Sequence, residues 1–288
     1  MGGGIPDVAG FYHDPTGSIA YLVIDPATRH AAIVDPVLDY DEKSGRVSTE
    51  FADMLLDEIA RRGLTIDWIL DTHPHADHFS AAAYLRGKLG APTAIGEKVT
   101  DVQKLWTGIY NLKGFPADGS QWDRLFKDGD TFKVGSLDGR VMFSPGHTLA
   151  SITYIIGNAA FIHDTLFQPD TGSARCDFPG GSASRMYDTI MAILSLPDDT
   201  RLFTGHDYKE GGRPPQWESS VAEQKRSNRH FRDKPTREQF VALREARDRT
   251  LPMPRLILHA LQVNMNGGRL PEPEDNGKRY LKIPIDAL

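Results

Sequence analysis

Three histidines and one aspartate, His73, His75, Asp77 and His78, lie within a six-residue stretch of the chain. Imidazole nitrogens and carboxylate oxygens are the atoms with which proteins bind zinc and non-haem iron. Burying so many polar groups without a metal or a hydrogen-bond partner would be costly. A polar loop with surface histidines is the alternative, but the length and spacing of the pattern favour a metal site.

Three segments farther along the chain each place another ligand-type residue after a run of apolar residues. His147 follows the run at 141–143, Asp164 follows the run at 159–162, and His206 follows a short run that ends in glycine. Each residue alone would be an ordinary loop residue. With the first cluster, however, four expected strands deliver nitrogen or oxygen ligands at one end, as the rim of an α/β site does.

The cluster at 73–78 lies between an apolar segment that ends at Leu70 and a helical pattern that runs from Ser80 to Gly90. The apolar segment predicts a buried strand, and the glycine predicts the end of the helix. We therefore expect the four ligands on a strand-to-helix turn, where side chains can converge.

Another helix is predicted upstream, with Ser48 or Thr49 as its capping residue and Gly63 near its end. The spacing of four apolar residues predicts the buried face of this helix: Phe51, Met54, Leu55 and Ile59. The alternation of such helices with apolar strands is typical of an α/β protein.

The last part of the chain contains a helix that Thr236 and Gln239 open with a capping-box pattern, before Phe240. Irregular sequence rich in proline follows. We expect residues 1–213 to form the metal-binding domain, and residues 214–288 to pack on it as a C-terminal extension.

Composition favours a cytoplasmic enzyme. The chain has 288 residues and a net charge of −6, and its pI near 5.9 argues against a nucleic-acid surface. No apolar run approaches a membrane span, and the start at Met1 lacks the basic and apolar regions of a signal peptide. The single cysteine, Cys176, excludes an internal disulfide and fits a reducing compartment.

The order HxHxDH, then Gly-His, then a strand-end Asp, then Gly-His resembles the metallo-β-lactamase superfamily, and the resemblance extends from Ala20 to Tyr208. It implies an α/β fold of two face-to-face β-sheets flanked by helices, with the metal at one edge. Within the superfamily the chain is most similar to two thiol-handling branches. These are the glyoxalase II hydrolases and the persulfide dioxygenases, also called sulfur dioxygenases.

The candidate ligands suffice for two metals, either Zn²⁺ or a mixed pair. One metal would have His73, His75 and His147, the other Asp77, His78 and His206, with Asp164 between them. Such a pair lowers the pKa of a bridging water and polarises an acyl oxygen. This arrangement implies a glyoxalase II-like thioester hydrolase.

The alternative uses only His73, His147 and Asp164, because two histidines and one carboxylate leave open positions on non-haem Fe(II). The resemblance to the persulfide dioxygenases implies one iron per chain at these three positions. The remaining candidates would then orient the ligands and the substrate. They are His75, Asp77, His78 and His206.

Three departures from the glyoxalase II pattern favour the dioxygenase. Glyoxalase II sequences usually have a glycine soon after the Asp-His of the motif, whereas here Phe79 follows directly and no glycine comes soon after it. Glyoxalase II sequences also usually have Gly-Asp at the bridging position, whereas here His163 precedes Asp164. The loop at 172–181 resembles the persulfide dioxygenase loop. We therefore predict a glutathione persulfide dioxygenase that consumes O₂ and yields sulfite and glutathione in sulfide detoxification.

The same loop holds the predicted substrate contacts. Arg175 suits a glutathione carboxylate, although an ion pair with Asp177 is the alternative, and Tyr208 is expected to line the pocket. Cys176 would take part in catalysis if its pKa were lowered, but an inert loop cysteine is the favoured interpretation. The resemblance also implies a homodimer.

Overall fold

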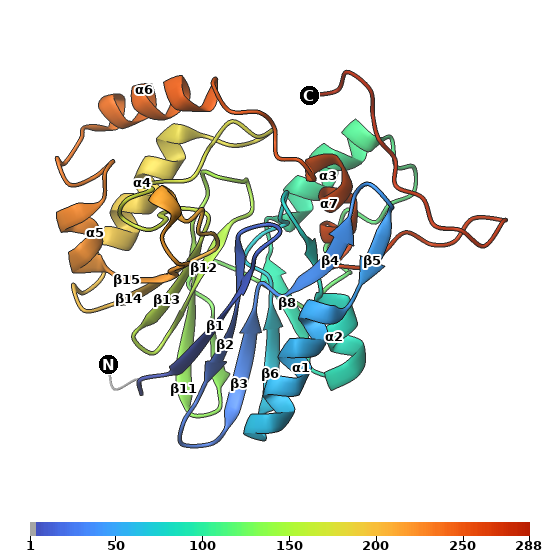
Figure 1. Cartoon of the computed structure of the whole chain (residues 1–288), viewed down its shortest axis with the longest axis horizontal. Helices are drawn as coiled ribbons and strands as arrows, with labels where there is room; N and C mark the ends of the chain where they lie inside the picture. The colour runs from blue at the N-terminus through green and yellow to red at the C-terminus, as the bar shows by residue number, and fades with distance from the viewer. Residues whose placement is uncertain (1–3) are drawn as a thin grey trace.

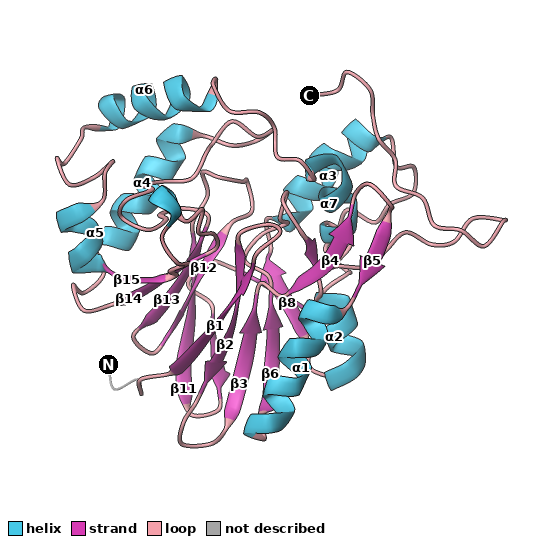
Figure 2. Cartoon of the chain, in the orientation of Figure 1, coloured by secondary structure: helices cyan, strands magenta, loops and turns pink. Residues whose placement is uncertain are grey.

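The computed structural model describes residues 4–288 and consists of two main β-sheets with helices on their outer faces (Figures 1 and 2). Residues 1–3, on which the expectation about the chain start partly rests, lie outside the described residues. The arrangement confirms the predicted α/β sandwich.

The first sheet has the strand order β1-β2-β3-β6-β8-β9. Its first three strands pair antiparallel, and the pairs from β3 onwards are parallel. The strands are β1 (Asp7–His13), β2 (Ser18–Ile24), β3 (His30–Val34), β6 (Thr65–Leu70), β8 (Thr93–Gly96) and β9 (Arg124–Phe126). Parallel pairing brings the carboxyl ends of β3 and β6 to one edge, where the histidine motif begins.

The second sheet has the order β10-β11-β12-β13-β14-β15, and only β13 and β14 pair in parallel. Its strands are β10 (Thr131–Val134), β11 (Leu137–Phe143), β12 (Ile152–Ile156), β13 (Ala159–His163), β14 (Arg201–Thr204) and β15 (Glu218–Ser220). Because β13 and β14 are parallel neighbours, the residues that follow them lie side by side.

A three-stranded sheet, β5-β4-β7, covers part of the upper rim in Figure 1. Its strands are β4 (Val37–Asp41), β5 (Arg46–Ser48) and β7 (Phe79–Ser80). The helices are α1 (Glu50–Arg62), α2 (Ala82–Leu89), α3 (Val99–Tyr110), α4 (Ala183–Leu194), α5 (Val221–Ser227), α6 (Arg237–Asp248) and α7 (Ile257–Asn264). Within residues 4–288, none of them is both long and apolar enough to cross a bilayer.

Aromatic side chains from both sheets fill the space between them. Tyr21 of the first sheet packs edge-on against Phe161 and Phe203 of the second, and all three are almost fully buried. A second apolar cluster joins the first sheet to α1 and α2, and a third joins the second sheet to α4 and α6. These layers hold the two sheets at a fixed separation, so the loops at the rim have a rigid base.

Helix α1 differs from its prediction in two details. Met54 is 42% exposed, because the buried face is formed by Phe51, Leu55 and Ile59 together with an alanine. The Thr49 side chain makes no capping bond; instead the carboxylate of Asp39 accepts a hydrogen bond from the Phe51 amide at 2.9 Å. The predicted end at Gly63 is confirmed, with that residue in a left-handed conformation.

The segment after residue 214 packs on both sides of the rim. Strand β15 joins the second sheet, α6 packs on α4, and α7 packs on β7. The predicted capping box of α6 is present, since Thr236 and Gln239 each bond the other's backbone amide. The boundary near residue 214 stays a prediction.

Candidate metal centre

The predicted ligands come together at one edge of the sandwich, at the ends of four strands. The histidine motif follows β6, His147 follows β11, Asp164 follows β13 and His206 follows β14. Of the candidates, only Asp77 keeps some exposure, and the others are at most 4% exposed. The strand-end pattern in the sequence therefore predicted the place of the site.

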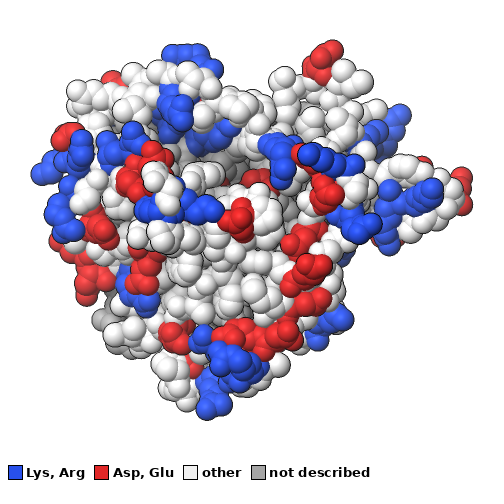
Figure 3. Space-filling view, in the orientation of Figure 1, with Lys and Arg blue, Asp and Glu red and all other residues white. Residues whose placement is uncertain are grey.

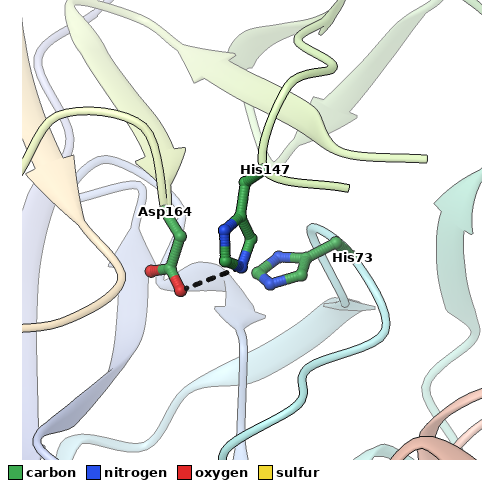
Figure 4. Close-up of side chains that lie close together, drawn as sticks. All are labelled: His73, His147 and Asp164. Atoms are coloured by element: carbon green, nitrogen blue, oxygen red, sulfur yellow. Dashed lines mark ion pairs between the residues drawn. The ribbon is translucent and has the colours of Figure 1, made fainter. Parts of the chain in front are cut away.

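One group consists of His73, His147 and Asp164, whose ligand atoms all lie within 4.8 Å of one another. Figure 4 shows the two imidazole rings and the carboxylate converging from separate segments of the chain. Nε2 of His147 lies 3.5 Å from Oδ2 of Asp164. These are the three residues predicted for a single iron.

Neighbouring hydrogen bonds determine which ring nitrogens carry protons. Nδ1 of His147 lies 2.8 Å from the Arg175 carbonyl oxygen, which can only accept, so Nδ1 is the donor. The Thr72 hydroxyl donates to Asp35 at 2.8 Å, so it accepts from Nδ1 of His73 at 3.0 Å. The Nε2 lone pairs of both neutral rings are therefore free to bind a metal.

The other oxygen of Asp164 is engaged elsewhere, because its Oδ1 accepts a hydrogen bond of 2.6 Å from Nδ1 of His206. Burial alone would raise the pKa of Asp164, but His206 and His147 outweigh that effect and lower the pKa. The carboxylate is ionised, and Oδ2 remains directed at the two free nitrogens.

His206 and His78 both contact the carboxylate of Asp77, although Nε2 of His78 is buried without a hydrogen-bond partner among residues 4–288. His206 donates from Nδ1 to Asp164 and lies with Nε2 2.6 Å from Oδ2 of Asp77. Burial opposes the charge on this ring, but Asp164 and Asp77 raise the pKa of His206 well above its usual value. The same Asp77 oxygen accepts from Nδ1 of His78 and from the Ser18 hydroxyl, each at 2.9 Å.

His75 does not group with His73 and His147, as the two-metal arrangement required. It groups with Asp77 and His78, and its Nε2 lies 3.0 Å from Oδ1 of Asp35. Burial lowers the pKa of His75, but Asp35 outweighs this and raises it to about 9. The ring therefore forms an ion pair with a carboxylate behind the site, although neither of its nitrogens meets hydrogen-bond geometry with another group of residues 4–288.

The His73 group fits a metal ion by its chemistry. Nε2 of His73 is buried and has no hydrogen-bond partner among residues 4–288, and it faces a second free nitrogen and a carboxylate oxygen. Three acceptors so close together, without a proton between them, are costly unless a cation binds them. Two nitrogens and one oxygen suit either iron or zinc.

A side-chain carboxylate and a glycine support the loops that carry the candidate ligands. Asp35 accepts hydrogen bonds from the amide of Thr72 at 2.7 Å and from its hydroxyl, which holds the start of the histidine motif. Gly205 is required for close approach, since a Cβ at this position would lie 2.4 Å from Oδ1 of Asp164. Any side chain there would displace the carboxylate.

A cavity of about 1030 Å³ opens from the site, with His147, Asp164, Asp77 and His206 in its wall. Figure 3 shows the surface hollowed between α6 and α7, with Lys and Arg side chains at its edges. The opposite wall comes from the segment after residue 214. The cavity is at the upper end of the roughly 300–1,000 Å³ typical of small-molecule sites.

Arg175 and Tyr208 both line this cavity, as predicted. The alternative ion pair is nevertheless formed, because Arg175 donates two bonds of 2.7 Å to Asp177 and a third to the Pro252 carbonyl. Tyr208 stacks parallel to His206, with the ring centroids 5.8 Å apart. Arg175 thus has two N–H groups left for a ligand.

Cys176 does not match the hypothesis of an activated thiol. Its side chain is buried among apolar residues behind the loop, and burial raises the pKa of the thiol rather than lowering it. It is absent from the cavity wall. The structure agrees with the inert alternative.

Sequence reasoning missed several residues that hold the site. Asn264 of α7 donates hydrogen bonds of 2.7 Å to the carbonyls of His75 and His78. Ser18 contacts three candidate ligands, and Arg244 and Asp248 form a buried ion pair below the 172–181 loop. An Arg and an Asp four residues apart, on a helix that is otherwise mostly polar, were the one signal available.

The chain belongs to the metallo-beta-lactamase superfamily, whose family profile matches residues 13–206. This match covers the histidine motif and all of the other candidate ligands. It confirms the family that the order of the motifs predicted.

Individual proteins extend this similarity. A "Beta-lactamase hydrolase-like protein" of Agrobacterium fabrum is 65% identical over 99% of this chain and 66% of its own length, so the chain spans just under two thirds of that relative. "Glyoxylase B2" of Dictyostelium discoideum is 46% identical over 93% of this chain and 92% of its own. The crystal structure of ETHE1 from Myxococcus xanthus has a TM-score of 0.72 at 32% identity, covering 91% of this chain and 100% of its own.

Proposed function

We propose that the protein is a persulfide dioxygenase with one Fe(II), held by His73, His147 and Asp164. The observation that carries this proposal is the contrast in protonation between the two ligand groups. His73, His147 and Asp164 present free lone pairs to one point, whereas both ring nitrogens of His206 are engaged with the carboxylates of Asp164 and Asp77. Two histidines and one carboxylate are the ligand set of many non-haem Fe(II) oxygenases.

The similarity to ETHE1, a persulfide dioxygenase, supports this branch of the superfamily. Fe(II) held by His73, His147 and Asp164 would supply O₂ activation, and the overall reaction would convert one persulfide, one O₂ and one water to sulfite, the free thiol and two protons. The protein's own part is to keep both histidine rings in the required tautomer through Thr72 and Arg175. Placing both reactants at one centre supplies the proximity that the reaction needs.

The cavity suits an anionic thiol such as glutathione persulfide. Among its arginines, Arg175 and Arg244 are each bonded to a carboxylate. Arg247 lines the cavity without a carboxylate partner in residues 4–288. Arg229 lies 3.8 Å from Glu210 and donates one hydrogen bond, to the Asp170 carbonyl. Arg247 and Arg229, with the spare donors of Arg175, can therefore bind the two glutathione carboxylates.

A thioester hydrolase with a dinuclear site is the second candidate function. It is favoured by the two further ligand groups, His75 with Asp77 and His78, and Asp77 with Asp164 and His206. The names of the Agrobacterium and Dictyostelium relatives also point in this direction. His206 would have to release a ring proton before it could bind a second metal, whereas Nε2 of His78 has no hydrogen-bond partner among residues 4–288.

The test is metal content and reaction on the same preparation, made with iron and zinc both available. One iron per chain, O₂ uptake with glutathione persulfide and sulfite release are expected. Two metals per chain, no O₂ uptake and cleavage of S-lactoylglutathione would assign the protein to the hydrolases instead. A homodimer and a cytoplasmic location stay predictions, to be tested by light scattering and by localisation of the tagged protein.

A further inference from the structure

We propose that Arg244 and Asp248 of α6 are positioning residues for the metal ligand His147, although neither residue touches it. The inference rests on the metal site proposed above and assigns a role to the segment after residue 214. It follows from a continuous series of short hydrogen bonds between α6 and the imidazole ring.

The pair is unusual for the helix that carries it. Most of α6 is exposed, yet Arg244 and Asp248 are each only 3% exposed, and Phe240 is the only other buried residue of the helix. Nε of Arg244 donates to Oδ1 of Asp248 at 2.9 Å. Burying an ion pair carries a large desolvation cost, so its retention calls for a role other than stability.

Both members of the pair bind the backbone of one loop. Arg244 donates to the Ser173 carbonyl at 2.8 Å, and Asp248 accepts from the Cys176 amide at 2.9 Å. The two bonds flank Arg175, whose carbonyl accepts the 2.8 Å bond from Nδ1 of His147. We call this arrangement of Arg244, Asp248 and the 173–176 backbone the α6 clamp.

The α6 clamp thus fixes the one acceptor that keeps His147 in its metal-binding tautomer. A side-chain substitution cannot remove the Arg175 carbonyl itself. The position of this carbonyl can, however, be disturbed by replacing Arg244 and Asp248, which hold the loop that carries it. Partners of metal-bound histidines contribute strongly to affinity, and their loss costs roughly 10- to 100-fold. We expect the clamp to contribute an effect of that order through Arg175.

The decisive variant is Arg244→Met with Asp248→Leu, because replacing both members of a buried pair with apolar residues is often neutral for folding. The double variant keeps the helix packed but leaves the loop without its two bonds. The matched control is Arg237→Gln with Asp188→Asn, which removes an exposed ion pair between the same helix and α4. That pair makes no contact with the loop.

The measurement is anaerobic titration of the metal-free proteins with Co²⁺, which reports ligand geometry in its visible spectrum and requires no turnover. Melting temperatures of the metal-free proteins give stability separately. We expect a 10- to 100-fold weaker Co²⁺ affinity and a changed spectrum in the clamp variant, at a melting temperature close to that of the wild type. The control should match the wild type in both.

Wild-type affinity and spectrum in a folded clamp variant would overturn the inference alone. No Co²⁺ binding by the wild type would overturn the metal site and, with it, the inference. If the double variant does not fold, Arg244→Lys serves in its place, since it retains the charge but loses the planar fork that reaches both Ser173 and Asp248. Unchanged Co²⁺ affinity in that folded variant would equally contradict the clamp.

Discussion

The His73 group and the His206 group at the rim contain the same residue types but differ in whether their nitrogens are free to bind a metal. In the His73 group, each ring gives its proton to a neighbouring oxygen and directs a bare nitrogen inward. In the His206 group, the ring lies between the carboxylates of Asp77 and Asp164 and gives protons to both. A count of histidines and aspartates therefore does not by itself give the number of metals, because the capacity of each residue to bind a metal depends on where the protons are.

Asp164 is the only residue shared by the two sides, so its replacement should have the largest effect. Asp164→Ala removes the third residue of the proposed metal site and the carboxylate that accepts a hydrogen bond from Nδ1 of His206. We expect loss of bound metal and of O₂ uptake together, measured by elemental analysis and an oxygen electrode. An active, iron-loaded variant would contradict the ligand assignment.

A matched pair of substitutions separates the two sides. His73→Gln should abolish metal binding, whereas His206→Gln should still bind one metal, with an affinity lower by roughly 10- to 100-fold. The reason is that His206 holds the Asp164 carboxylate in place without itself offering a lone pair. Metal stoichiometry measures the difference, and a wild type with two metals that falls to one in His206→Gln would favour the hydrolase.

Ser18 should matter less, since it contacts only the side that shares protons. Its hydroxyl donates to Asp77 and lies 3.1 Å from Nδ1 of His78 and from Nε2 of His206. Ser18→Ala should lower the free energy of unfolding by about 1.5–3 kcal/mol, as expected for a lost hydrogen bond to a charged group, and leave one metal per chain. Denaturant unfolding and metal analysis give both values, with Ser18→Thr as the hydroxyl-retaining control.

The smallest effect is expected from Cys176→Ser. The thiol lies outside both ligand groups, and its buried environment raises the pKa away from the range in which a thiolate forms. Persulfide turnover should equal that of the wild type. A large loss of turnover in a folded, iron-loaded variant would revive a covalent role.

The place where the candidate ligands meet could be predicted because each follows an apolar strand, and parallel strands end at a common edge. The apolar run before the residue is a strong local signal for His147, Asp164 and His206, because the strand that it predicts is enough to locate each of them at the rim. The tautomers could not be predicted, since they depend on the Thr72 hydroxyl and the Arg175 carbonyl. Such contacts exist only once the loops are folded.

The supporting residues were missed for a related reason. Ser18 and Asn264 are far from the histidine motif in the chain and reach it only through the packing of β2 and α7. The residue spacing of α6 predicts a helix but does not show which of its polar faces is buried. The sequence therefore could not distinguish a buried Arg244–Asp248 ion pair from an exposed one. Met54 on α1 shows the opposite error, since an apolar residue that was predicted to be buried lies at the margin of the buried face and is exposed.

The position of the α6 clamp in the chain also sets a time order. During synthesis the three proposed ligands are complete when the ribosome has added Asp164, but Arg244 and Asp248 come much later. At roughly 5–20 residues per second, several seconds pass between these events. A growing chain therefore holds the three proposed ligands before the helix that, in our proposal, positions His147, and we expect a metal bound in that interval to exchange faster than after α6 has packed.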